Sequence, residues 1–154
     1  MRILPLLLLL AAGPASAEDS PLAGNWKLIS FQVIYDNDPP QEKYGARPQG
    51  VLILTREGWM ASFITAETRK AGTSDAERAV LHKTMLAYSG RYRVEDKAFI
   101  ITVDMSWNEA WNGTEQRRFW KIEDGKLFIE SAPAPSVNNP GKMAVGRVVW
   151  EREK

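Results

Sequence analysis

The sequence has 154 residues, of which 20 are Lys or Arg and 19 are Asp or Glu, so that its formal net charge is +1. This near balance argues against nucleic acid or an anionic membrane as a partner. Because there is no cysteine and only one histidine, His82, cysteine catalysis, thiolate metal sites and multi-histidine metal sites are excluded, and we expect no cofactor.

Residues 1–17 predict a secretory signal peptide. Arg2 supplies a positive start, residues 4–10 form a leucine-rich core, and Ala15-Ser16-Ala17 is a small-x-small cleavage site. The core is too short to span a bilayer, which needs about 20 residues. We therefore expect cleavage to leave residues 18–154 as one periplasmic or secreted domain without membrane insertion.

The first strand, from Asn25 to about Tyr35, carries an irregularity. Trp26, Leu28 and Ser30 share one face, and then Phe31, Val33 and Tyr35 take up the opposite phase. A change of phase by one residue within a strand predicts a β-bulge, which bends the strand.

A loop over 36–49, rich in turn residues, separates this strand from a hairpin over 50–65. A helix is predicted to follow, because Ser74 and Glu77 have the spacing of a capping box. It should end near Ala87, and its apolar stripe of Val80, Leu81 and Met85 should pack on the barrel or at its mouth.

Alternating patterns and turn residues predict the remaining strands, over 88–94, 98–107, 115–123, 126–131 and 143–152, with a proline-rich loop over 132–142. The whole set is all-β, with about eight strands and one short helix between strands three and four. We expect an antiparallel up-and-down barrel, closed by pairing of the first strand with the last.

Four ordered motifs make the chain similar to the bacterial lipocalin-like domain family. They are Gly24-x-Trp26-x-Leu28-x-Ser30-Phe31, Tyr88-Ser89-Gly90-Arg91-Tyr92, Trp111-x-Gly113-Thr114-x-Gln116 followed by Arg118, and Val148-x-Trp150-x-Arg152. The resemblance covers nearly all of residues 18–154 and implies a lipocalin-type barrel with an internal cavity. It implies no settled reaction. After Gln116 the sequence is one residue shorter than the family pattern, which leaves open which arginine faces inward.

If the strands keep their phase, a set of mainly aromatic side chains points into the barrel. We predict that these side chains form a ligand-binding site, together with Arg118: Tyr88, Tyr92, Val103, Met105, Trp107 and Trp120. They could equally form a packed core, since eight strands permit either. Trp150 shares this inward orientation.

An inward Arg118 could anchor a ligand carboxylate or phosphate, or could pair with a buried tyrosine or acid. Asp104 is expected to face outward and to pair with an arginine such as Arg117. Trp26 and Arg152 should stack at the closed end of the barrel as a structural contact. His82, off the helix stripe, has no predicted role.

These patterns favour a non-catalytic module that binds a small hydrophobic or amphipathic molecule. Two alternatives are an isomerase or cyclase that uses the same cavity, and a structural protein with a filled core. An inward carboxylate or tyrosine with a strongly shifted pKa would favour the enzyme, and a roomy cavity would argue against the filled core.

Overall fold

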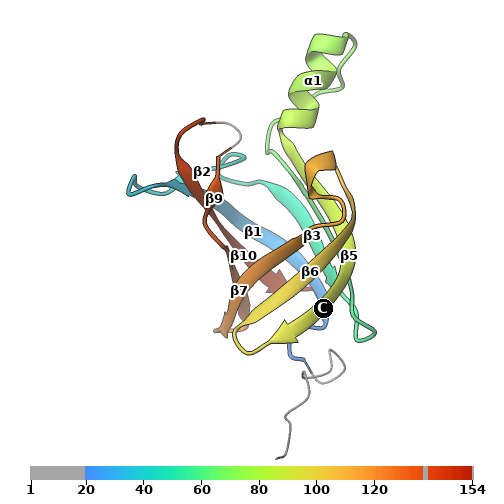
Figure 1. Cartoon of the computed structure of the whole chain (residues 1–154). Helices are drawn as coiled ribbons and strands as arrows, with labels where there is room; N and C mark the ends of the chain where they lie inside the picture. The colour runs from blue at the N-terminus through green and yellow to red at the C-terminus, as the bar shows by residue number, and fades with distance from the viewer. Residues whose placement is uncertain (1–19, 137–138, 154) are drawn as a thin grey trace, which may run out of the picture.

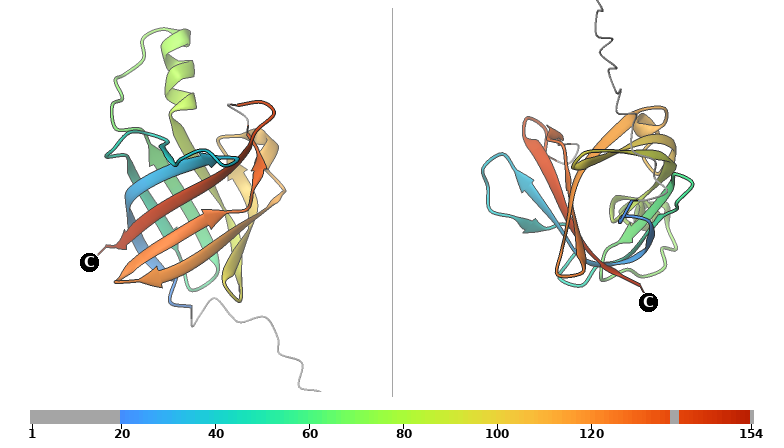
Figure 2. Two further views of the ribbon diagram at one scale, coloured as in Figure 1. Left: turned by 90° about the vertical axis from the view of Figure 1, so that its left-hand side faces the viewer. Right: turned by 90° about the horizontal axis from the view of Figure 1, so that it is seen from below.

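The computed structural model describes residues 20–136 and 139–153, whose antiparallel strands form one closed barrel (Figure 1). The eight barrel strands, in neighbour order, are β1 (Gly24–Tyr35), β3 (Gln49–Leu54), β4 (Trp59–Thr65), β5 (Met85–Glu95), β6 (Ala98–Ser106), β7 (Glu115–Glu123), β8 (Lys126–Ser131) and β10 (Met143–Arg152). A ladder between β1 and β10 closes the ring, as the view along its axis shows (Figure 2). The predicted barrel and its closing strand pair are therefore confirmed, whereas the predicted signal peptide lies outside the described residues.

Two short strands extend the sheet beyond the barrel. The first, β2 (Gln41–Glu42), pairs with β1, and the second, β9 (Ala134–Pro135), pairs with β10. Both lie in predicted loops. The helix α1 (Asp75–Lys83) therefore lies between β4 and β5, and its predicted place between strands three and four is wrong. Two-residue strands have no periodicity to detect, and a proline is tolerated in β9 because it lies at the sheet edge.

The predicted bulge in β1 is present. Leu28 pairs with Trp150 and Ser30 with Val149, so Ile29 is the extra residue. Because of this bulge, the side chains that point into the barrel are at even positions before Ile29 and at odd positions after Ser30. The buried side chains of β1 are accordingly Trp26, Leu28, Phe31, Val33 and Tyr35.

A second bulge, between β5 and β6, was not predicted. Ser89 pairs with Met105 but Gly90 pairs with Val103, so Asp104 is the extra residue. Beyond it the phase of β6 is inverted: Ser106 is buried and Met105 is 68% exposed. The predicted inward orientation of Met105 is therefore wrong.

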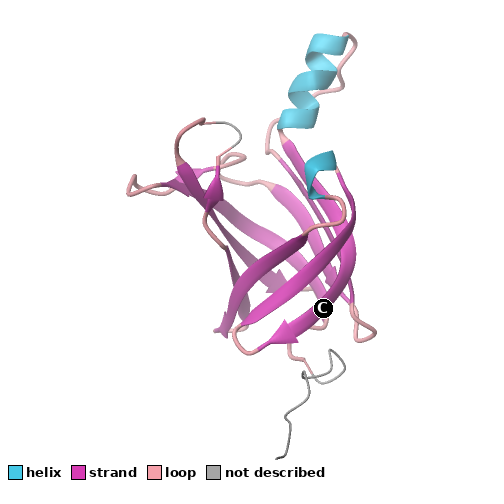
Figure 3. Ribbon diagram, in the orientation of Figure 1, coloured by secondary structure: helices cyan, strands magenta, loops and turns pink. Residues whose placement is uncertain are grey.

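The helix α1 stands beyond one end of the barrel, at the same end as the short 3-10 helix η2 (Glu109–Trp111) (Figure 3). Its capping box between Ser74 and Glu77 is present, as predicted. None of its residues is buried, and Val80 is 58% exposed, so the predicted packing of the helix on the barrel is wrong. The helix also ends earlier than expected, because Met85 to Ala87 pair with β4.

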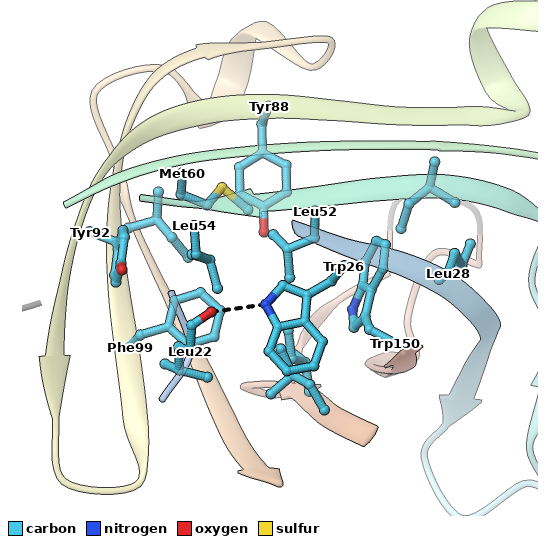
Figure 4. Packing of buried hydrophobic residues seen from close by; sticks show 14 of the residues in the cluster. Leu22, Trp26, Leu28, Leu52, Leu54, Met60, Tyr88, Tyr92, Phe99 and Trp150 are labelled. Carbon is cyan, nitrogen blue, oxygen red and sulfur yellow. Dashed lines mark hydrogen bonds between the residues drawn. The ribbon is translucent and has the colours of Figure 1, made fainter. Parts of the chain in front are cut away.

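The opposite end, where β1 begins and β10 ends, is filled by side chains (Figure 4). Trp26 Nε1 donates a hydrogen bond of 2.8 Å to the Leu22 carbonyl. The Arg152 guanidinium lies 4.2 Å from the centre of the Trp26 ring and donates to the carbonyls of Ala23 (2.8 Å) and Pro21 (2.6 Å). The predicted contact between Trp26 and Arg152 is present, and we call this end the closed end and the opposite one the mouth.

Candidate functional site

A cavity of about 670 Å³ lies inside the barrel. Its floor consists of buried apolar side chains from five strands: Leu52, Met60, Phe99, Ile129 and Trp150. Figure 4 shows Leu52, Met60, Phe99 and Trp150 near Trp26 of the closed end. Polar and charged residues of the mouth also line it, among them Lys43, Lys83, Asn108 and Glu109. The cavity argues against the alternative of a structural protein with a filled core.

Arg118 is the buried charged residue of the cavity wall, with 9% of its surface exposed. Its Nη1 donates to the Arg117 carbonyl (3.0 Å) and its Nη2 to Gln116 Oε1 (3.4 Å). Both acceptors are neutral, and none of the ion pairs among the described residues includes Arg118. The guanidinium therefore carries a buried charge that the described side chains do not neutralise.

The neighbouring Arg117 faces the outside of the barrel. It pairs with Glu95 at 2.9 Å, and Glu95 also pairs with Arg93 at 3.0 Å. The predicted partner, Asp104, forms no such pair within the described residues, because the pairing of β6 with β7 ends at Thr102. The prediction of an Asp104–Arg117 pair is wrong, and the arginine that faces inward is Arg118.

Two aromatic rings flank the Arg118 guanidinium, whose carbon lies 5.7 Å from the Tyr88 ring centre and 5.6 Å from that of Trp111. These two rings meet edge to face at 5.4 Å, and Trp111 meets Trp107 in the same way at 4.9 Å. Asn108 caps η2, which carries Trp111. The rings limit the positions that the guanidinium can adopt and add cation–π attraction.

At the mouth, Tyr44 lines the cavity and donates its hydroxyl hydrogen to the Met85 carbonyl at 2.9 Å. Burial raises the pKa of Tyr44 to about 12, against a smaller opposing effect of Arg69. Burial also lowers the pKa of the adjacent Lys43. The raised pKa keeps the Tyr44 phenol protonated, so this group can donate a hydrogen bond but is a poor proton acceptor at neutral pH.

His82, which had no predicted role, also reaches the mouth. Its Nε2 lies 3.1 Å from the Trp107 carbonyl, and since a carbonyl only accepts, this nitrogen is the donor in the contact. The interaction connects the end of α1 to the segment before η2. It links two chain segments at the cavity entrance.

The structure brings three of the seven predicted site residues to the cavity wall: Tyr88, Trp107 and Arg118. Tyr92 and Val103 are buried but do not line the cavity, and Tyr92 donates instead to the Thr55 carbonyl at 2.8 Å. Trp120 is partly buried and packs against the core. Met105, as described above, faces outward.

Sequence reasoning missed most of the floor and part of the mouth. Leu52 lies in a strand that is apolar on both faces, so no alternation indicates its orientation. Tyr44 lies in a predicted loop. Trp111 belongs to one of the four family motifs, and that motif was the available signal for it.

A catalytic use of the cavity predicted an inward carboxylate or tyrosine with a strongly shifted pKa. Tyr44 has the shift, but in the direction that holds its proton. The carboxylate at the cavity wall, Glu109, is at the mouth and accepts a hydrogen bond from Asn112 at 2.8 Å. The isomerase or cyclase alternative stays a prediction.

Two further properties concern only residues 20–136 and 139–153. No group of three or more histidine, cysteine, aspartate or glutamate side chains there is placed to hold a metal ion. No helix in that part of the chain has the length and apolar character needed to cross a membrane.

Comparison with known proteins bears on the family. None of the curated proteins compared with the chain matches it. A family model described as "Lipocalin-like domain" matches residues 23–153, which include all eight barrel strands, the cavity wall and the four motifs. The fold and this match agree with the resemblance carried by those motifs, and the chain therefore belongs to the lipocalin-like domain family.

Proposed function

We propose that the protein binds a small hydrophobic or amphipathic molecule inside the barrel. The observation that carries the proposal is the cavity of about 670 Å³ with an apolar floor. Binding sites for small molecules are mostly apolar, hold a few placed polar groups and enclose about 300–1,000 Å³. The family supports a ligand-binding barrel in general terms, and the cavity lining supports the kind of ligand.

The distribution of lining residues favours a molecule with two different ends. Side chains that fill the floor, such as Leu52, Phe99 and Trp150, are apolar and buried. Polar groups are on the mouth side, where Lys43, His82 and Asn108 line the cavity. A ligand whose apolar part lies on the floor and whose polar part lies toward the mouth would match both regions.

Ligand binding is tested by incubating the purified protein with envelope lipids and aromatic metabolites. Tryptophan fluorescence is a suitable readout because Trp107, Trp111 and Trp150 line the cavity. We expect at least one class of compound to change this fluorescence and to raise the melting temperature. Failure of the whole set to do either would contradict the proposal.

A matched pair of variants on β4 locates the binding site. Ser62 is buried and lines the cavity, whereas its neighbour Ala61 does not line it. The substitution Ser62→Phe places a ring in the cavity and is expected to weaken binding about tenfold or more. Ala61→Phe, the control, adds the same ring outside the cavity and should leave the affinity unchanged. Equal affinities of two folded variants would place the ligand elsewhere.

We also propose that the protein is exported, to the periplasm or beyond the cell, on the basis of the signal peptide in residues 1–17. The test is expression of the full chain followed by cell fractionation and intact mass measurement. We expect the exported protein to begin at Glu18. Full-length chain retained inside the cell would contradict export.

A further inference from the structure

We propose that the ligand of the cavity carries a carboxylate, and that this carboxylate pairs with Arg118 while the rest of the molecule lies on the apolar floor. The inference rests on the proposed function and adds the chemical class of the ligand. It depends on three features of the described residues: the uncompensated charge of Arg118, its level in the barrel, and the charges at the mouth.

The first feature is the state of the guanidinium. An arginine has five N–H donors and stays protonated in proteins. The described hydrogen bonds of Arg118 go to the carbonyl of Arg117 and the amide oxygen of Gln116, both of them neutral. A charge taken out of water is costly unless an opposite charge accompanies it. A bound anion would supply that opposite charge. It would also accept hydrogen bonds from the N–H groups of Arg118 that have no acceptor among the described residues.

The second feature is the level of Arg118 between floor and mouth. Along the β7–β8 ladder, Ile122 pairs with Leu127, Trp120 with Ile129, and Arg118 with Ser131 at the end of β8. Leu127 and Ile129 belong to the core that continues into the closed end, and Ile129 forms part of the cavity floor, whereas Ser131 lines the cavity two residues farther along β8. On the β6 side Arg118 pairs with Phe99, which is also part of the floor, but its guanidinium lies 5.6 Å from the ring of Trp111, in η2 at the mouth. The guanidinium therefore lies on the mouth side of the floor. An anionic group bound there leaves the apolar part of the ligand directed toward the closed end.

The third feature is the charge of the lining. Arg118, Lys43 and Lys83 are basic and Glu109 is acidic, which gives three positive groups against one negative group when His82 is neutral. A concave surface with an excess of one sign attracts ligands of the other sign. This excess favours an anionic amphiphile over a neutral or cationic one.

A carboxylate fits this site better than a phosphate monoester. Arg118 is the buried cation of the cavity wall, and one guanidinium neutralises one negative charge. A planar carboxylate can accept two parallel N–H bonds from it. A phosphate monoester carries close to two charges at neutral pH, and its second charge would have no buried cation as a partner, because Lys43 and Lys83 lie at the mouth.

The experiment compares ligands of the same chain length that differ only in the head group. Dodecanoate, dodecanol, dodecylamine and dodecyl phosphate compete, each below its aggregation concentration, with the neutral probe N-phenylnaphthylamine for the wild-type cavity. We expect dodecanoate to bind about tenfold or more tightly than dodecanol, which corresponds to a charge-assisted hydrogen-bonded pair. We expect dodecylamine to bind most weakly, and dodecyl phosphate more weakly than dodecanoate.

Two variants assign the preference to Arg118. Arg118→Met removes the charge but keeps an unbranched apolar side chain, and should abolish the advantage of dodecanoate over dodecanol while dodecanol still binds. Arg118→Lys keeps the charge and should retain part of the advantage. Arg117→Met is the matched control: it removes an outward-facing arginine of the same strand, paired with Glu95 outside the cavity, and should retain the full advantage. Circular dichroism establishes that each variant is folded, and the wild-type series decides the question alone if Arg118→Met does not fold.

The outcomes separate this inference from the proposed function. If dodecanol displaces the probe as well as dodecanoate does, the cavity binds amphiphiles but the carboxylate inference is wrong. A stronger effect of dodecyl phosphate would also overturn it, in favour of a dianionic head group. The same holds if Arg118→Met preserves the preference in a folded protein. If neither the probe nor any amphiphile binds, the proposed function itself fails.

Discussion

At the scale of single residues, the closed end and the cavity wall use the same pairing of arginine with aromatic rings for different purposes. Arg152 lies against Trp26, and its guanidinium donates to two backbone carbonyls of the segment that precedes β1. Arg118 lies near Tyr88 and Trp111 with few and neutral acceptors. The first arginine has its acceptors within the chain, whereas the second has donors left for a ligand.

The closed-end contact predicts a loss of stability in Arg152→Met. This variant loses two charge-assisted hydrogen bonds and a cation–π contact, and we expect it to lower the free energy of unfolding by about 1–2 kcal/mol. Arg147→Met on the same strand is the control, because it removes an exposed ion pair with Glu130 and should cost below about 1 kcal/mol. Urea denaturation measures both. Equal losses of unfolding free energy would show that the contacts of Arg152 at the closed end stabilise the fold no more than a surface ion pair does.

The Tyr44 hydroxyl predicts a pH dependence of stability. Burial disfavours the phenolate, so the pKa of Tyr44 is about 12 when the chain is folded and about 10 when it is unfolded. The resulting stabilisation is fully present below about pH 10 and is lost as the pH rises from about 10 to about 12; screened by solvent, it amounts to roughly 1–2 kcal/mol.

The variant Tyr44→Phe isolates this effect. Urea denaturation from about pH 9 to about pH 12 should show a shallower loss of stability for the variant than for the wild type, because the variant lacks the titrating group. The comparison is between the two slopes, since other tyrosines and the lysines titrate in both proteins. Identical slopes would mean that Tyr44 titrates with the same pKa in the folded and unfolded chains.

At the scale of elements, the segments that could be predicted are those whose signal lies within the element itself. The phase change in β1 reveals the bulge at Ile29 without knowledge of its partner, and the Ser74–Glu77 spacing reveals the helix start. The bulge at Asp104 depends on the partner strand. A Cβ atom on Gly90 would collide with the Thr102 carbonyl oxygen, and the alternation of β6 gives no sign of this close approach between the two strands.

The same distinction applies to the candidate site. Tyr88 and Arg118 were predicted from alternation because their strands keep phase. Tyr44 reaches the wall from a segment that is irregular in sequence, and only the folded position of that segment brings it there. The helix pattern was misleading in part, because Met85 extends the apolar stripe of α1 but belongs to β5.

The isolated position of α1 predicts low protection of its backbone. With no buried residue, the helix has little packing to oppose local opening, so hydrogen exchange in residues 75–83 should proceed with an opening free energy of about 0–2 kcal/mol. The adjacent β5, hydrogen-bonded on both sides, is the internal control and should exchange far more slowly. Exchange measured by mass spectrometry tests this. Equal protection of the two would show that α1 packs on another surface in solution.

At the scale of the whole molecule, the two ends of the barrel differ, and this difference creates the cavity. The closed end is filled by the segment before β1 together with Arg152, whereas the mouth carries α1, η2, β2 and β9 (Figure 1). Eight strands leave an interior that side chains can fill or that can hold one small ligand. Here the side chains fill the closed end and leave about 670 Å³ above it.

Closure of this barrel depends on the ladder between its first and last strands, which predicts that the chain tolerates circular permutation. The described ends lie together, since the Glu153 amide donates to the Asn25 carbonyl at 2.9 Å. A Gly/Ser linker of about four residues from Glu153 to Ser20, with new ends between Asp124 and Gly125, leaves every barrel strand intact. The control permutant opens within β6, between Ile101 and Thr102.

We expect the first permutant to keep the β-type circular dichroism and the ligand affinity of the parent, and to lose only about 1–3 kcal/mol of stability by opening one hairpin turn. The control interrupts a strand whose residues pair on both sides, and it should fail to fold or lose ligand binding. If the first permutant also fails while the parent folds, the ladder between β1 and β10 does not hold the ring closed without the original chain connectivity. In that case the cavity depends on the β7–β8 turn as much as on the closing pair.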